Sequence, residues 1–263
     1  MGIDTVITYG CVPKERFTTQ GLLERIKAGE RAQEFIQFYR VNNDTRPIDE
    51  MGGEVMLRSA DGEEEVKTIM VKDLLAQRAE LGDVEQHCAG CPANRSGAPF
   101  GCIGRINYPI SQLAEVWMLA QLPDQQDPLP FLLLTRAEEF GFTGKVAHQL
   151  RGDSPGVIFE TLDTLGRRFS TMEITGNQLF ELFFLMGEVI PIKRAVMILL
   201  FMHAIPRDLD ADKLMSLTPA PADPLPFLHQ HEDSDDASIR DIKNFLHALY
   251  LAYTLDRELY VDV

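Results

Sequence analysis

Three of the four cysteines lie within fifteen residues of one another, at Cys88, Cys91 and Cys102. Their Cys-x2-Cys-x10-Cys spacing is typical of thiolates that bind one metal ion, because a tight turn can direct two sulfurs separated by two residues toward a common centre. The segment that follows contains Gly and Pro, so it can fold back and bring in the third sulfur. The sequence therefore predicts a metal site in this loop.

A tetrahedral site needs a fourth ligand, and Cys11 is the remaining cysteine. It lies in a Gly-Cys-Val-Pro turn at the end of a predicted strand. His87 is the alternative, but an immediate neighbour of Cys88 can bind the same ion only with strain. Burial of the thiols as small apolar groups fits poorly with the polar, Gly-rich surroundings. The predicted metal ligands are Cys11, Cys88, Cys91 and Cys102.

Two kinds of metal centre fit four thiolates. A zinc ion would attach the loop to the N-terminal strand and contribute to folding, and we expect zinc. An iron–sulfur cluster that carries or senses electrons is the alternative, since the Cys91-Pro92 step also occurs in ferredoxin ligand runs. A redox disulfide between Cys88 and Cys91 is disfavoured, because such pairs usually begin a helix and no helical pattern begins here.

Other polar side chains have structural explanations. His229 and His231 could share a metal, but we expect an exposed polar loop there. Glu181 and Glu188 would lie about 10 Å apart along a helix, which is wide for a shared reaction centre, so we expect a solvated stripe. His203 is expected to be a hydrogen-bonded core histidine.

No active-site signature is found, so whether the protein is an enzyme stays open. Ser154 in Gly-Asp-Ser is followed by Pro-Gly, and we expect a turn rather than an esterase nucleophile. Neither Gly-x-Gly-x-x-Gly nor Gly-x4-Gly-Lys occurs in the sequence, so a nucleotide cofactor has no support.

Charge limits the class of partner. The chain has 263 residues, with 25 basic and 40 acidic side chains and a formal charge of -15. This charge repels phosphate backbones and anionic membrane surfaces. Nucleic acid is therefore not expected as a partner, and an unidentified protein partner is compatible with the composition.

The sequence predicts a cytoplasmic protein. The first residues lack a basic region followed by an apolar run, so no signal peptide is expected. Residues 179–205 are apolar but interrupted by charges and a proline, which argues against a membrane span. Few cysteines, most of them clustered, indicate metal ligands in a reducing compartment.

We predict an α+β fold with a cysteine-bearing unit at 1–122 and a mainly helical unit at 123–263, although one domain is compatible with the length. In the first unit we expect a strand at 5–9, a helix to residue 40, a hairpin at 54–71 with its turn at Asp61-Gly62, a short helix at 72–81 and a strand at 103–108. A helix capped by Ser111 should follow, with an apolar face formed by Leu113, Val116, Trp117 and Ala120.

The stretch 122–130 is the predicted linker. Its Asp-Pro-Leu-Pro-Phe-Leu sequence, residues 127–132, recurs at 223–228, and we expect two extended segments. The second unit should contain a hairpin between 157–161 and 168–174, followed by a helix with a Thr175–Gln178 capping box. A buried helix around 195–202, a helix at 238–257 and a short strand at 259–261 complete the prediction.

Overall fold

The chain folds as two compact units, one inserted into the other. The computed structural model describes residues 2–58, 64–136, 141–170, 172–210, 212, 217 and 221–263. Met1–Tyr9 and Gly101–Val263 form one unit, which we call the host unit, and Gly10–Phe100 form the other, the insertion unit. This division differs from the boundary predicted at residue 122. Helices and strands are mixed and the C-terminal region is mainly helical, as the predicted α+β class requires.

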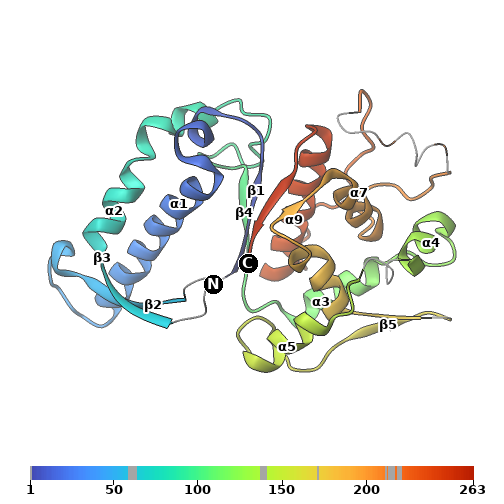
Figure 1. Cartoon of the computed structure of the whole chain (residues 1–263), viewed down its shortest axis with the longest axis horizontal. Coiled ribbons are helices and arrows are strands. Elements are labelled where there is room, and N and C mark those ends of the chain that lie inside the picture. Colours follow the sequence, from blue (N-terminus) through green and yellow to red (C-terminus); the bar gives the residue numbers. More distant parts are fainter. Residues whose placement is uncertain are drawn as a thin grey trace. The chain divides into compact units, whose positions relative to one another are not determined.

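A four-stranded antiparallel sheet organises the host unit (Figure 1). The predicted N-terminal strand pairs with strands far along the chain, which is why it belongs to the same unit as the C-terminal half. Val6 lies opposite Ile103 on one side and Tyr260 on the other. In spatial order the strands are β4 (Ile103–Asn107), β1 (Gly2–Ile7), β8 (Leu259–Asp262) and β7 (Val189–Ile190).

The insertion unit leaves and rejoins this sheet at one end of the β1–β4 pair. The pairing ends at Val6 and Ile103, and the next residues are still joined because Ile7 N–H donates to the Cys102 carbonyl at 3.2 Å. The two connections between the units therefore start from neighbouring points of the host sheet.

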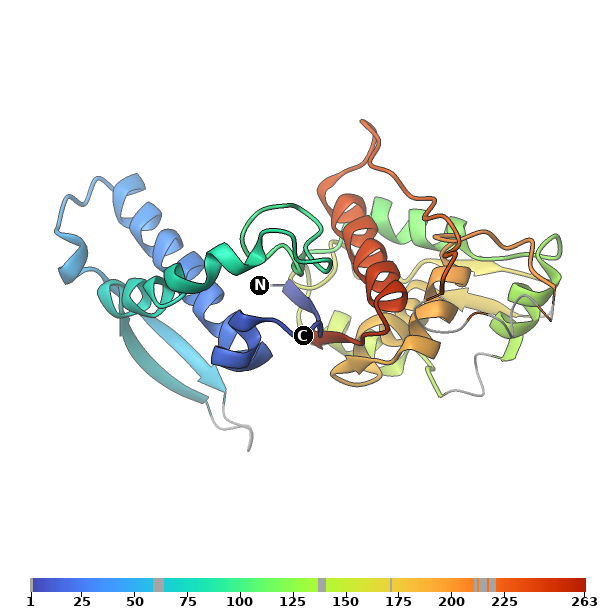
Figure 2. The same cartoon turned by 90° about the horizontal axis from the view of Figure 1, so that it is seen from above.

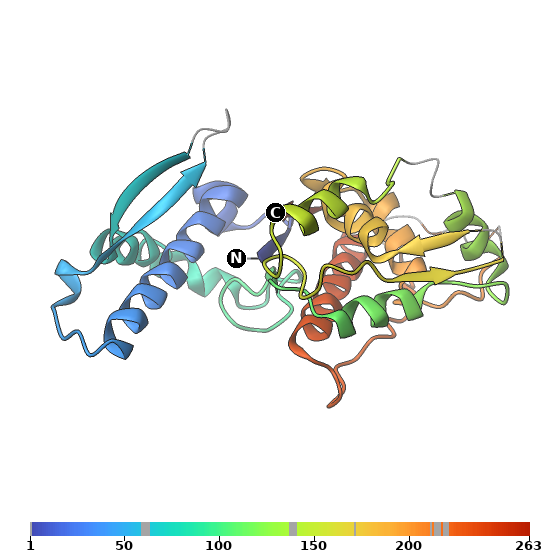
Figure 3. The same ribbon diagram turned by 90° about the horizontal axis from the view of Figure 1, so that it is seen from below.

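Helix α9 packs against β1 and β4 of the host sheet and against α7 (Figures 1 and 3). Most side chains of α7 are buried, and so are Ile242, Phe245, Leu246 and Leu249 of α9. The helices are α3 (Gln112–Gln121), α4 (Pro128–Arg136), α5 (Lys145–Asp153), α6 (Gly176–Phe180), α7 (Ile192–Phe201) and α9 (Ala237–Thr254), and a π-helical turn at Glu181–Leu185 follows α6.

Local capping signals correctly predicted where helices start. The Ser111 hydroxyl accepts the Ala114 N–H at 3.0 Å at the start of α3. Thr175 and Gln178 form the predicted capping box of α6. The predicted hairpin is displaced: its strands are β5 (Gly166–Arg168) and β6 (Glu173–Thr175), and 157–161 contributes only a bridge from Phe159 to Ile110.

The apolar face predicted for α3 is wrong. Leu113 and Val116 are 63% and 52% exposed, and Ala120 is exposed as well. The buried face consists of Ala114, Glu115, Met118 and Leu119. Compared with the prediction, α3 is thus rotated about its axis, so that the Glu115 carboxylate is buried.

The insertion unit packs two helices and a hairpin (Figure 2). Helix α1 passes through Gly29, where an added Cβ would lie 2.7 Å from the Arg78 side chain, so glycine lets α2 pack closely. The core contains Ala28, Ala32, Met51, Val71 and Leu74. The elements are α1 (Val12–Val41), a 3-10 turn η1 (Ile48–Glu50), β2 (Gly52–Arg58), β3 (Glu64–Met70), α2 (Val71–Ala79) and a 3-10 helix η2 (Gly82–Cys88).

The hairpin of this unit confirms the prediction for 54–71, while its predicted turn at Asp61-Gly62 lies outside the described residues. Helix α1 contains one irregularity, Thr18, whose φ of 62° is unusual for a β-branched residue. Among the described residues, no helix combines the length and apolar character needed to cross a bilayer.

Candidate functional site

A tight turn presents the first two cysteines of the predicted site. Helix η2 ends at Cys88, and the Cys91 N–H donates to the Cys88 carbonyl at 3.3 Å. Between them, Ala89 has φ -66° and ψ 127°, and Gly90 has φ 72°. These angles define a type II turn, which requires glycine at its third position. The sequence Cys-Ala-Gly-Cys therefore folds into the turn expected for a pair of metal ligands.

Asn94 holds the loop that follows. Its side-chain amide donates to the carbonyls of Cys88 and Ala98, both at 2.9 Å. Its Oδ1 accepts the backbone N–H groups of Ser96 at 3.2 Å and Gly97 at 2.9 Å. One asparagine thus satisfies four backbone groups and fixes the loop against the end of η2.

The loop ends in a direct contact with a cysteine sulfur. Phe100 N–H donates to Cys88 Sγ at 3.2 Å. The φ of Phe100 is 61°, a conformation that costs a non-glycine residue about 1–3 kcal/mol. Its ring is buried and lies 5.6 Å below the Arg78 guanidinium. The buried Phe100 ring therefore sits on a strained backbone, and the N–H group of that backbone is directed at the Cys88 thiol.

Cys11 lies at the first turn of α1. It is the N-cap residue, its side chain makes no capping hydrogen bond, and its carbonyl accepts the Glu15 N–H at 3.0 Å. Cys11 and Cys91 are partly exposed, whereas Cys88 is buried. All four cysteines of the chain are free thiols.

The pKa of the Cys88 thiol depends on the groups around it. Burial raises the pKa of the Cys88 thiol, the N–H of Phe100 opposes this rise, and the nearby Cys11 and Cys91 add to it. Mutual destabilisation of thiolates is expected where sulfurs share a site without a cation. Cys11 and Cys91 thus affect the pKa of Cys88, and all three belong to the insertion unit.

The remaining predicted ligand and its rival are placed differently. Cys102 belongs to the host unit, immediately before β4, and is buried. His87 is an exposed residue of η2. Over the described part of the chain, no group of three or more His, Cys, Asp or Glu side chains is arranged to hold a metal ion. The zinc and iron–sulfur assignments therefore stay predictions.

The histidine candidates do not form a site together. His229 Nε2 hydrogen-bonds the Met202 carbonyl at 2.7 Å, and its ring contacts Trp117 with centroids 5.1 Å apart. Burial lowers the pKa of His229. His231 instead hydrogen-bonds Asn244 Oδ1 at 3.1 Å. His203, expected in the core, is exposed.

Glu181 corrects another expectation, because it is buried rather than solvated. Its carboxylate accepts the N–H groups of Gly144, Val146 and Ala147 at 2.7, 2.6 and 3.3 Å. These donors form the start of α5, where unpaired N–H groups favour a negative charge. Glu188 is exposed. Glu181 is thus a structural anchor for α5.

Sequence reasoning missed a buried ion pair in the host unit. Glu115 on α3 is fully buried and meets Arg151 of α5 through two hydrogen bonds of 2.5 and 3.2 Å. Arg151 also donates to the carbonyls of Thr161 and Asp163 and lies 3.7 Å from the centroid of the Phe159 ring. Burial raises the pKa of Glu115, and Arg151 opposes the rise. No local sequence signal could have paired residues 36 positions apart.

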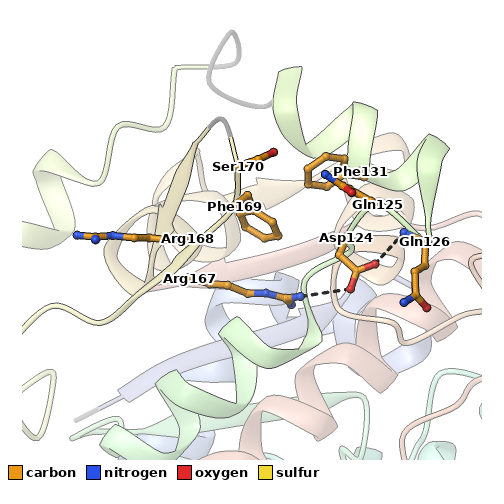
Figure 4. A pocket seen from close by; sticks show the side chains of 8 residues that line it. All are labelled: Asp124, Gln125, Gln126, Phe131, Arg167, Arg168, Phe169 and Ser170. Carbon is orange, nitrogen blue, oxygen red and sulfur yellow. Dashed lines mark hydrogen bonds and ion pairs between the residues drawn. The ribbon is translucent and has the colours of Figure 1, made fainter.

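A pocket of about 370 Å³ opens between the β5–β6 hairpin and the start of α4 (Figure 4). Phe131 and Phe169 line it and pack against each other, with ring centroids 5.4 Å apart and ring planes tilted by 50°. Arg167 donates to the carbonyls of Leu119, Ala120 and Leu122, so it caps the end of α3. Arg168 points away from the pocket. The Arg167 guanidinium therefore has a structural role at the end of α3.

The searches for relatives returned no match: no protein-family model, curated protein or solved structure is similar to this chain.

Proposed function

We propose that this is a metal-anchored, cytoplasmic binding or regulatory protein whose cysteines hold one structural zinc ion. The proposed ligands are Cys11, Cys88, Cys91 and Cys102. When bound, the ion would supply folding energy rather than reactivity. It would join the start of α1 to the cysteine loop.

The loop that presents Cys88 and Cys91, together with the electrostatic influence of Cys11 on Cys88, carries this proposal. Cys11 and Cys91 both act on the pKa of Cys88. The loop is preorganised by the type II turn and by the four hydrogen bonds of Asn94. The N–H of Phe100 already donates to Cys88 Sγ, and such a bond favours a thiolate over a thiol.

The donor set suits the ion, but its geometry is not that of a closed site. Cysteine sulfurs are the preferred ligands of structural zinc. Because the described residues contain no ready group of three ligands, the proposal requires side-chain rotations that bring the sulfurs together when an ion binds. Metal binding and local ordering are commonly coupled in this way.

Chain connectivity supports Cys102 as the fourth ligand. Only Gly101 separates it from Phe100, whose amide contacts Cys88. Two peptide units span at most about 7.6 Å between Cα atoms. Cys102 is therefore tethered near the loop by its covalent bonds alone.

The cytoplasmic location is supported by the four free thiols, since an oxidising compartment would favour disulfides. The acidic charge of -15 supports a protein or small-molecule partner over nucleic acid.

Elemental analysis of freshly purified protein tests the proposal. We expect one equivalent of zinc in a colourless protein. Cys88→Ser should lose the metal and unfold at a lower denaturant concentration, because the buried thiol and its N–H partner are central to the loop. His87→Ala, an exposed neighbour, is the matched control and should keep the full metal content.

An iron–sulfur cluster is the alternative on the same residues. A brown protein with visible absorption and equivalent iron and sulfide would favour it over zinc. Protein that contains neither metal when purified anaerobically, or a Cys88→Ser variant with normal metal content, would refute the four-cysteine site.

A further inference from the structure

A second cavity, in the insertion unit, contains none of the cysteines. It has a volume of about 450 Å³, which lies in the range of small-molecule sites. Helix α1, strand β3 and helix α2 form its walls. The lining residues are Glu24, Lys27, Ala28, Arg31, Lys67, Thr68, Ile69, Asp73, Leu74 and Gln77.

The floor of this cavity is apolar. Ala28 and Leu74 are only 4% and 3% exposed and belong to the core of the unit, and Ile69 packs against them. A ligand seated here would therefore remove apolar surface from water, which favours an aliphatic group at the bottom of the cavity.

Cations from two different elements stand around this floor. Lys27 and Arg31 are one helical turn apart on α1, and Lys67 comes from β3. Within the described part of the chain, the side chains of Arg31 and Lys67 have no hydrogen-bond or ion-pair partner. Other arginines of this unit are paired, for example Arg25 with Glu80 and Arg78 with Glu85, both at 2.8 to 2.9 Å.

Unpartnered cations are notable because the chain carries a charge of -15 and has ample carboxylates. Arginine and lysine above an apolar floor form a site for an anionic head with an aliphatic tail. Glu24 and Asp73 also line the cavity. Their negative charges oppose a polyanion such as a polyphosphate, and a single carboxylate meets less repulsion.

We propose that this cavity binds a small amphipathic monocarboxylate. The carboxylate lies between Arg31 and Lys67, and the aliphatic chain covers Ala28, Ile69 and Leu74. This inference goes beyond the proposed metal site, and it holds whether or not the cysteines bind an ion.

A titration of the full-length protein with hexanoate, followed by ligand-observed NMR, tests the proposal. We expect saturable binding that weakens about fourfold for each methylene removed, so butyrate should bind about fifteenfold more weakly. Arg31→Gln should weaken hexanoate binding about tenfold or more, because a charged hydrogen bond is lost.

Lys72→Gln is the matched control, because it removes a charge from an exposed position of α2 outside the cavity. It should bind hexanoate as the parent protein does. Three results would overturn the proposal: no saturable binding, equal affinity of Arg31→Gln and parent protein, or inorganic phosphate binding more tightly than hexanoate. Metal content is unaffected by these variants, so failure here leaves the zinc proposal standing, and failure of the zinc proposal leaves this one standing.

Discussion

At the scale of single residues, the host unit depends on a charge that it buries. Glu115 has no exposed surface and its partner Arg151 is 2% exposed. Gly176 makes room for the pair, because an added Cβ there would lie 2.5 Å from Glu115 Oε1. Arg151 also joins α5 to Asn177 of α6 through a 3.2 Å hydrogen bond. The pair therefore holds three helices in one arrangement.

Arg151→Ala should destabilise the protein strongly, by about 3–5 kcal/mol, because it leaves a buried carboxylate without a partner. Urea unfolding measures this free energy. Arg168→Ala is the matched control: Arg168 is 85% exposed and pairs with Glu173 at 3.4 Å. Removal of such an exposed pair should cost at most about 1 kcal/mol. Similar losses in the two variants would show that the buried pair does not support the fold.

At the scale of elements, the cysteine loop depends on backbone conformations that few residues adopt. Gly90 has φ 72°, and an added Cβ there would meet no atom within 4 Å. Glycine is therefore required at position 90 for its backbone conformation and not because a side chain would lack space. The turn that presents Cys88 and Cys91 exists because this position is glycine.

Gly90→Ala should destabilise the loop by about 1 kcal/mol, the cost of left-handed backbone for a residue with a Cβ. We also expect weaker metal retention against a chelator. Gly82→Ala is the control, since Gly82 has equal space and no positive φ. It should be neutral in unfolding experiments. If both variants keep the metal equally, the turn is not required for the site.

Element starts could be predicted from the sequence because their causes are local. Ser111 and the Thr175–Gln178 box act within three residues of the helix starts they determine. The buried face of α3 could not be predicted, because it depends on Arg151. The same limit applies to the proposed metal site. The turn and the loop follow from Gly90 and Asn94, whereas a meeting of all four sulfurs would depend on segments distant in sequence.

The repeated hexapeptide shows the same limit directly. We expected both copies to be extended, but residues 128–132 of the first copy begin α4, with Phe131 N–H donating to the Asp127 carbonyl at 2.8 Å. The second copy, residues 223–228, forms neither helix nor strand, and its Leu228 N–H donates to the Ala204 carbonyl at 2.9 Å. Identical letters thus take two conformations because their surroundings differ.

At the scale of the whole molecule, the insertion unit interrupts a strand pair that needs only a short connection. Val6 opposite Ile103, with Ile7 hydrogen-bonded to Cys102, is the pairing found beside a hairpin turn. The division at Tyr9 and Gly101 could not be predicted, because no sequence signal shows that β1 pairs with strands about 100 and 250 residues away.

The host unit should fold without the insertion. Replacement of residues 9–100 by Asn-Gly would join Thr8 to Gly101 through a two-residue hairpin turn. We expect cooperative thermal unfolding and dispersed amide NMR signals from this shortened chain. A variant with the same deletion and Pro-Pro in place of Asn-Gly is the control and should be less stable, since proline cannot adopt this turn. Collapse of both chains without dispersed signals would show that the host unit needs the insertion.

Strand β1 is buried along nearly its whole length and lies between β4 and β8 in the finished sheet. Ribosomes add roughly 5–20 residues per second, so β1 leaves the exit tunnel many seconds before either neighbour exists. The insertion unit, with its own core, is complete just before β4 and can fold long before β8 emerges. Until then the Gly2–Ile7 segment has unpaired edges, and we expect chaperones that bind exposed strands to recognise this part of the nascent chain.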